Sequence, residues 1–132
     1  MEPLADSLAR AEWQPRGQAS FVCTSYSSSD IKKQLSGNFS SALEQYELQA
    51  WKKSAGFTRI NSGEGLLLPV AIIAGEPHIS DGTTSTKLVQ NMEPVPFKTG
   101  YVISGSLYYV VALPRPAQPE KFDNAPAKGD ET

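Results

Sequence analysis

The sequence predicts a single α+β domain in which one main helix packs on an antiparallel β-sheet. Two observations indicate this fold class. Residues 39–55 carry chemical signals for both ends of a helix, and the run from Gly65 to Leu113 contains apolar, β-branched and aromatic stretches separated by Gly and Pro. The length of 132 residues has room for one hydrophobic core, since domains commonly contain about 100–150 residues.

The first part of the chain, residues 1–17, is expected to be an N-terminal extension of the domain. Residues 3–14 have the pattern of a short helix with Leu4 and Leu8 on one face, and Pro15 follows them as a stop signal. A first strand is then predicted over 18–26, because its side chains alternate between two faces. A Ser-rich cap and one or two helical turns are expected next.

The main helix is predicted over residues 39–55. Ser41 and Glu44 have the spacing of a capping box, and the stop signals are Lys52, Lys53 and Gly56. A helical wheel gives one apolar stripe that would face the sheet. Outside that stripe it places a second apolar strip, formed by Leu48, Trp51 and Ala55. This strip is either covered by the N-terminal extension or available to a partner.

The sheet is predicted from the first strand together with short apolar or alternating segments that begin at residue 57. Its strands are expected at 18–26, 57–61, 66–74, 86–92, 98–103 and 106–113. Pro69 cannot donate a ladder hydrogen bond, which indicates an edge position or a bulge. The last two segments resemble a hairpin turning at Gly105, or alternatively one long strand kinked there. The alternative fold is a small, partly open β-barrel with a helix plugging one end.

The main domain is expected to end near residue 113. Residues 114–132 contain four prolines and an acidic end, which predicts a disordered or surface-hugging tail. The net charge of −2 is too small to steer the chain strongly toward polyanions. The beginning of the chain lacks a secretion signal, and no long apolar run indicates a membrane span, so an intracellular protein without a membrane partner is expected.

Catalytic and metal sites receive little support from the sequence. Cys23 and His78 could form a nucleophilic pair with Asp81 or Glu76, but nothing in the sequence brings them into contact. One Cys and one His are too few for a structural zinc site. The stretch that contains His78 and both carboxylates lacks regular ligand spacing and is better explained as a turn. No metal, cofactor or catalytic residue is therefore predicted.

The predicted function is a non-enzymatic protein-binding or assembly module, such as a structural component, an inhibitor or an immunity-type protein. Its expected partner is another protein or a second copy, and its expected binding residues are Leu48, Trp51 and Ala55. An aromatic anchor such as Trp51 commonly dominates the energy of an interface.

The alternative is a β-domain that binds single-stranded nucleic acid and has an acidic C-terminal tail. In that hypothesis bases would stack on Phe97, Tyr101 and Tyr108. The basic residues around them are sparse, however, and adjacent strand positions such as 108 and 109 face opposite sides of a sheet.

Overall fold

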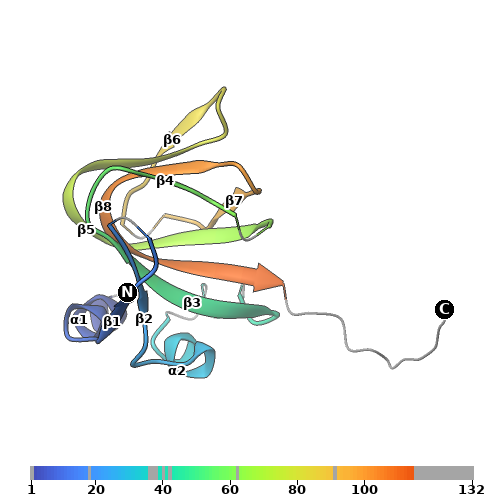
Figure 1. Ribbon diagram of the computed structural model, residues 1–132. Helices are drawn as coiled ribbons and strands as arrows, with labels where there is room; N and C mark the ends of the chain where they lie inside the picture. Colours follow the sequence, from blue (N-terminus) through green and yellow to red (C-terminus); the bar gives the residue numbers. More distant parts are fainter. Residues whose placement is uncertain are drawn as a thin grey trace, which may run out of the picture.

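Two long strands, β5 (Gly65–Ser80) and β8 (Val102–Pro114), form the centre of the sheet (Figure 1). The computed structural model describes residues 2–17, 19–35, 39, 41, 43–61, 63–90 and 92–114. Within them it shows a small, sheet-dominated domain with eight antiparallel strands and two short helices. The other elements are α1 (Glu2–Ala9), β1 (Trp13–Pro15), β2 (Ser20–Cys23), α2 (Ser28–Lys33), β3 (Tyr46–Lys53), β4 (Phe57–Arg59), β6 (Ser85–Lys87) and β7 (Val95–Phe97).

The sheet is open and has the strand order β1-β2-β3-β8-β5-β6, with β4 paired to β8 and β7 paired to β5. Along the edge of β8 that faces away from β5, the two halves of the strand have different neighbours. Residues near Val102 pair with β4, and residues from Leu107 onward pair with β3. The ladder between β5 and β8 shifts register three times, first between Pro69 and Ala71. Such bulges bend strands and increase their twist. The sheet consequently curls, and β4 and β6 lie across from β3 (Figure 1).

The outer face of the curled sheet is covered by both helices. Leu4 and Leu8 of α1 and Ile31 of α2 have no solvent exposure. They belong to the outer core, whose buried members are Leu4, Leu8, Cys23, Ile31, Leu35, Leu43, Leu48, Ala50, Leu68, Val70, Val110 and Ala112. The N-terminal helix therefore packs against the sheet, and its period of three to four residues places its leucines on one buried face.

The inner face encloses a second cluster between the two halves of the sheet. The inner core consists of Ile60, Leu67, Ile79, Leu88, Phe97, Ile103, Leu107 and Tyr109. Alternation along β8 explains why one strand serves both clusters, because Tyr109 faces inward while Val110 faces outward. In the described part of the chain no helix has the length and apolarity needed to cross a membrane.

The predicted main helix over 39–55 is wrong. Glu44 donates a backbone hydrogen bond to Ser41, so the expected capping site does begin a turn, but Tyr46–Lys53 then forms strand β3. All eight residues of β3 pair with β8, and three of them pair with β2 on the other side. These cross-strand partners override the helix propensity of residues such as Glu, Leu, Gln, Ala and Lys.

Several strand predictions also need correction. Instead of the predicted hairpin over 98–113, one strand, β8, begins at Val102 and continues through Gly105, as the alternative interpretation expected; residues 98–101 are not part of a strand. β5 extends six residues beyond the predicted end at residue 74, and β6 covers only the beginning of the predicted segment 86–92. The open sheet, with both helices against its outer face, also differs from a barrel plugged by a helix.

Other strand predictions are confirmed. Pro69 lies at a bulge, and strands occur within 18–26 and 57–61. β1 and β7 were not predicted, because each has three residues and contains a proline. The predicted tail lies outside the described residues, apart from Pro114.

Candidate functional site

A groove of about 360 Å³ opens on the inner side of the curled sheet. Its floor comes from β3 and β8, one wall from β4 and the two residues after it, and its rim includes residues that precede and begin β2. The lining residues are Arg16, Ser20, Gln49, Trp51, Thr58, Arg59, Ile60, Asn61, Phe97, Ile103, Tyr109, Val111 and Leu113. The groove therefore joins five separate parts of the sequence on one surface, the fifth being Phe97 of β7.

Trp51 lies in the groove because β3 is a strand. Along β3, Leu48 and Ala50 face the outer core, whereas Gln49 and Trp51 face the groove. Trp51 is half-buried and packs against the inner core, and its register partner on β8 is Tyr109. A half-buried indole combines apolar contact area with access to a ligand, and its ring nitrogen is a hydrogen-bond donor.

The charged side chains of the groove are both positive. Arg16 and Arg59 are exposed and line it, and no Asp or Glu occurs among the described residues of the lining. A guanidinium group presents five donors and is always charged, so two of them favour anionic or acceptor-rich ligands. The groove thus has a positive rim although the chain as a whole has a net charge of −2.

A buried polar cluster supports the wall of the groove. The ammonium group of Lys53 donates hydrogen bonds to the Ala55 carbonyl at 2.7 Å and to Thr58 Oγ1 at 3.0 Å. Thr58 Oγ1 also lies 3.1 Å from Ser20 Oγ. Lys53 has no solvent exposure, and this burial lowers the pKa of its amine. The cluster links β2, β3 and β4 at the place where the curled sheet brings them together.

Of the three residues predicted to form one helical strip, only Trp51 lines the groove. Leu48 is 3% exposed and belongs to the outer core, on the opposite face of β3. Ala55 lies in the turn after β3, where its carbonyl accepts the bond from Lys53. The strip itself was wrong, because positions 48 and 51 share a helix face but lie on opposite faces of a strand.

Of the aromatic residues of the nucleic-acid alternative, Phe97 and Tyr101 line one pocket, whereas Tyr108 lies on the other face of the sheet. Phe97 is 2% exposed and belongs to the inner core. Tyr101 is half-buried and lines a smaller pocket of about 210 Å³, next to Lys98. Tyr108 packs against the outer core and stacks on Trp13, with 5.7 Å between the ring centroids.

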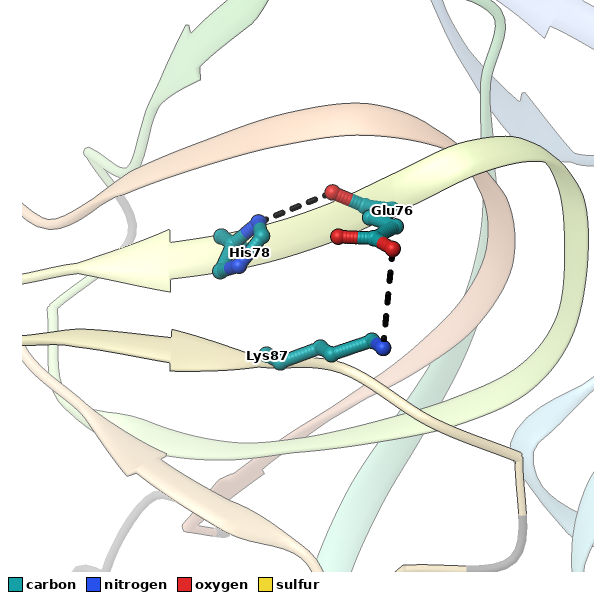
Figure 2. Close-up of polar contacts among 3 residues, drawn as sticks. All are labelled: Glu76, His78 and Lys87. Atoms are coloured by element: carbon teal, nitrogen blue, oxygen red, sulfur yellow. Dashed lines mark hydrogen bonds and ion pairs between the residues drawn. The ribbon is translucent and has the colours of Figure 1, made fainter.

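The residues considered for a nucleophilic site occupy different parts of the fold. Cys23 is buried in the outer core, whereas His78 lies on β5, beside β6. Figure 2 shows Glu76, His78 and Lys87: the His78 ring nitrogen Nδ1 lies 2.8 Å from the Glu76 carbonyl, and the Glu76 carboxylate forms an exposed ion pair with Lys87. The contact of His78 stays within β5, and only the exposed ion pair joins β5 to β6.

Asp81 forms the turn of that hairpin. Its carboxylate accepts hydrogen bonds from the backbone amides of Thr84 and Thr83, at 2.7 and 2.8 Å. These bonds lower the pKa of Asp81 below its ordinary value. Among the described residues, no group of three or more His, Cys, Asp and Glu side chains is placed to hold a metal ion.

Sequence reasoning missed the groove and the buried role of Lys53. Arg16 and Arg59 lie more than forty residues apart in the printed sequence, and only the curl of the sheet brings them together. Lys53 resembled an ordinary helix-stop signal, and no local pattern distinguishes it from its neighbour Lys52. A comparison of the sequence with models of known protein families and with curated proteins finds no match.

Proposed function

We propose that this domain is a non-enzymatic protein-binding or assembly module and that the groove over Trp51 is its binding face. The observation that carries the proposal is the groove itself, which combines a half-buried Trp with two exposed Arg side chains. Trp and Arg are among the residue types that most often dominate binding energy at protein interfaces. The apolar residues Val111 and Leu113 extend the floor beside them.

The roles that fit this proposal are a structural component, an inhibitor and an immunity-type protein. The groove volume of about 360 Å³ is near the lower end of typical ligand sites. A volume of this size suits the side chains of a short segment, which is how an anchor residue of a protein partner inserts into a pocket. Such a segment can come from a different protein or from a second copy of the chain.

The first experiment is a selection of random peptides displayed on phage against the full chain, followed by affinity measurements with two variants. Trp51→Ala removes the groove aromatic, and Trp13→Ala removes the other Trp, which lies on the outer face. We expect selected peptides to bind Trp51→Ala at least about tenfold more weakly, a difference of about 1.4 kcal/mol, and to bind Trp13→Ala like the unchanged protein.

Self-association is tested in parallel by size-exclusion chromatography with light scattering at low and high salt. A dimer that dissociates in Trp51→Ala, with unchanged far-ultraviolet circular dichroism, supports an assembly role. The proposal is overturned if selection yields no peptide sensitive to Trp51 and if Trp51→Ala lowers stability without changing the solution mass.

The alternative function is binding of single-stranded nucleic acid, and one arrangement favours it. Trp51 shares the groove with Arg16 and Arg59, and an aromatic ring next to cationic side chains is the usual composition of a base-stacking site. This hypothesis predicts salt-sensitive binding of fluorescent oligonucleotides and quenching of Trp51 fluorescence. The absence of binding at low salt would exclude it.

A further inference from the structure

The groove contains a buried polar group that lacks a partner. Tyr109 is 3% exposed and lines the groove, and its hydroxyl forms no hydrogen bond with any residue that the structure describes. Buried polar groups are hydrogen-bonded in the large majority of cases, so this hydroxyl is available as a donor to a group that enters the groove. Burial also raises the pKa of Tyr109, which keeps the phenol protonated and therefore a donor.

The charges around the groove specify the chemistry of that acceptor. Arg16 and Arg59 line it without an acidic side chain in the described lining. Behind the wall, the buried ammonium of Lys53 lies 3.0 Å from the Thr58 hydroxyl and forms no ion pair within the described part of the chain. Arg16 and Arg59 in the lining, with the ammonium group of Lys53 behind it, give this part of the groove a positive potential, and charge complementarity therefore favours an anionic acceptor.

Resting on the proposed protein-binding function, we propose that the groove recognises an acidic peptide segment. A Glu or Asp carboxylate of the segment accepts hydrogen bonds from the groove donors of Arg16, Arg59 and Tyr109. An adjacent apolar side chain packs on Trp51 and Leu113. Arg binds carboxylates with a planar, often bidentate geometry, and such charge-assisted bonds are roughly twice as strong as neutral ones.

The test uses two fluorescent libraries of short synthetic peptides that are identical except at one position. In both libraries one fixed position holds an aromatic or aliphatic residue. The next position holds Glu in one library and Gln in the other. Fluorescence anisotropy with the full chain should show the Glu library binding about tenfold more tightly, because a hydrogen bond to a charged acceptor is stronger than one to a neutral amide. This preference should weaken as salt increases.

Three variants and one control assign the preference to the groove. Arg59→Gln and Arg16→Gln should each reduce the preference for Glu over Gln to about threefold or less. Arg10→Gln is the matched control, because Arg10 is also exposed but lies just after α1 and outside the groove lining. Tyr109→Phe removes only the hydroxyl and should weaken binding of the Glu library without unfolding the protein.

The outcomes separate this inference from the proposed function. Equal binding of both libraries, weakened by Trp51→Ala, overturns acidic recognition and retains a protein-binding groove. A Glu preference that persists in both Arg variants also overturns the inference, because the carboxylate then binds elsewhere. If neither library binds and the random-peptide selection also fails, the proposed function itself is wrong.

Discussion

Lys53, the last residue of β3, donates a hydrogen bond from its buried Nζ to Thr58 Oγ1 in β4, at 3.0 Å. The two strands follow each other in the chain but do not pair, because each pairs with a different half of β8. A second bond from Nζ to the Ala55 carbonyl holds the turn between them. The ammonium group thereby ties the two halves of the curled sheet together at the edge of the groove.

The Lys53 amine should make stability depend on pH in the alkaline range. Burial lowers its pKa in the folded state from 10.5, whereas the unfolded chain keeps the ordinary value. Between these two values the unfolded state binds more protons, so the free energy of unfolding rises as the pH increases toward 10.5. Lys53→Met removes this contribution. We expect urea unfolding to show a wild-type advantage over Lys53→Met that increases from neutral pH to about pH 10.

Lys98→Met is the control for this measurement, since it also removes one ammonium group but Lys98 is exposed. Its stability difference from wild type should change little over the same range. A pH slope that is identical in Lys53→Met and wild type would show that the buried amine does not titrate as its environment indicates.

Gly105 should tolerate no side chain, because β8 approaches β5 closely at this point. A Cβ atom at Gly105 would lie 2.6 Å from Pro77 Cα, and the residue has a φ of +100°. Gly100 has the same φ but open space around the equivalent position. Gly100→Ala is therefore expected to lose about 1–3 kcal/mol from backbone strain alone. Gly105→Ala should lose clearly more, as measured by urea unfolding; equal losses would contradict the close approach.

The central strands β5 and β8 were predictable as strands, although not in their bounds, because their signal lies in local composition. The apolar run 66–74 is continuous as expected of a buried strand, and Pro69 correctly indicated its bulge. The kink at Gly105 was left with two interpretations, since a glycine that permits a turn also permits a bend in a continuous strand. Only the long ladder between β5 and β8 decides between them.

Residues 46–53 could not be assigned from local signals. Their sequence, YELQAWKK, has high helix propensity and follows a capping-box pattern. Strand β3 forms because β8 offers eight register partners and both core clusters accept its two faces. A helical wheel indicated Trp51 as a binding residue, but residues 46–53 form a strand. Its position in the groove follows from the alternation of side chains between the two faces of that strand.

The hydroxyl of Tyr109 should contribute little to folding. It is buried without a partner in the described part of the chain, so Tyr109→Phe removes a desolvated polar group rather than a hydrogen bond. We expect the free energy of unfolding at neutral pH to stay within about 1 kcal/mol of wild type or to increase. A larger loss would reveal a hydrogen bond that stabilises the fold and would weaken the role assigned to this hydroxyl in peptide binding.

Tyr109→Phe should also change the alkaline behaviour in the direction opposite to Lys53→Met. Burial raises the pKa of the folded phenol above 10.0, so the unfolded chain ionises first and stability falls as the pH rises beyond that value. Tyr109→Phe has no phenol to ionise and therefore does not lose this stability. Urea unfolding at neutral pH and above pH 10.0 should therefore show Tyr109→Phe gaining relative to wild type in alkali. An unchanged difference would indicate that water reaches the phenol.

Trp13 and Tyr108 should be energetically coupled, because their rings stack with an interplanar angle of 27°. A double-mutant cycle with Trp13→Leu and Tyr108→Leu is expected to give a coupling energy of about 0.5–1.5 kcal/mol in urea unfolding. Peptide binding should be unchanged in both single variants, since neither residue lines the groove. Strict additivity would show that the stacking is energetically neutral. A measured coupling would mean that Tyr108 stabilises the fold through Trp13, so a base could stack on it only by displacing the N-terminal segment.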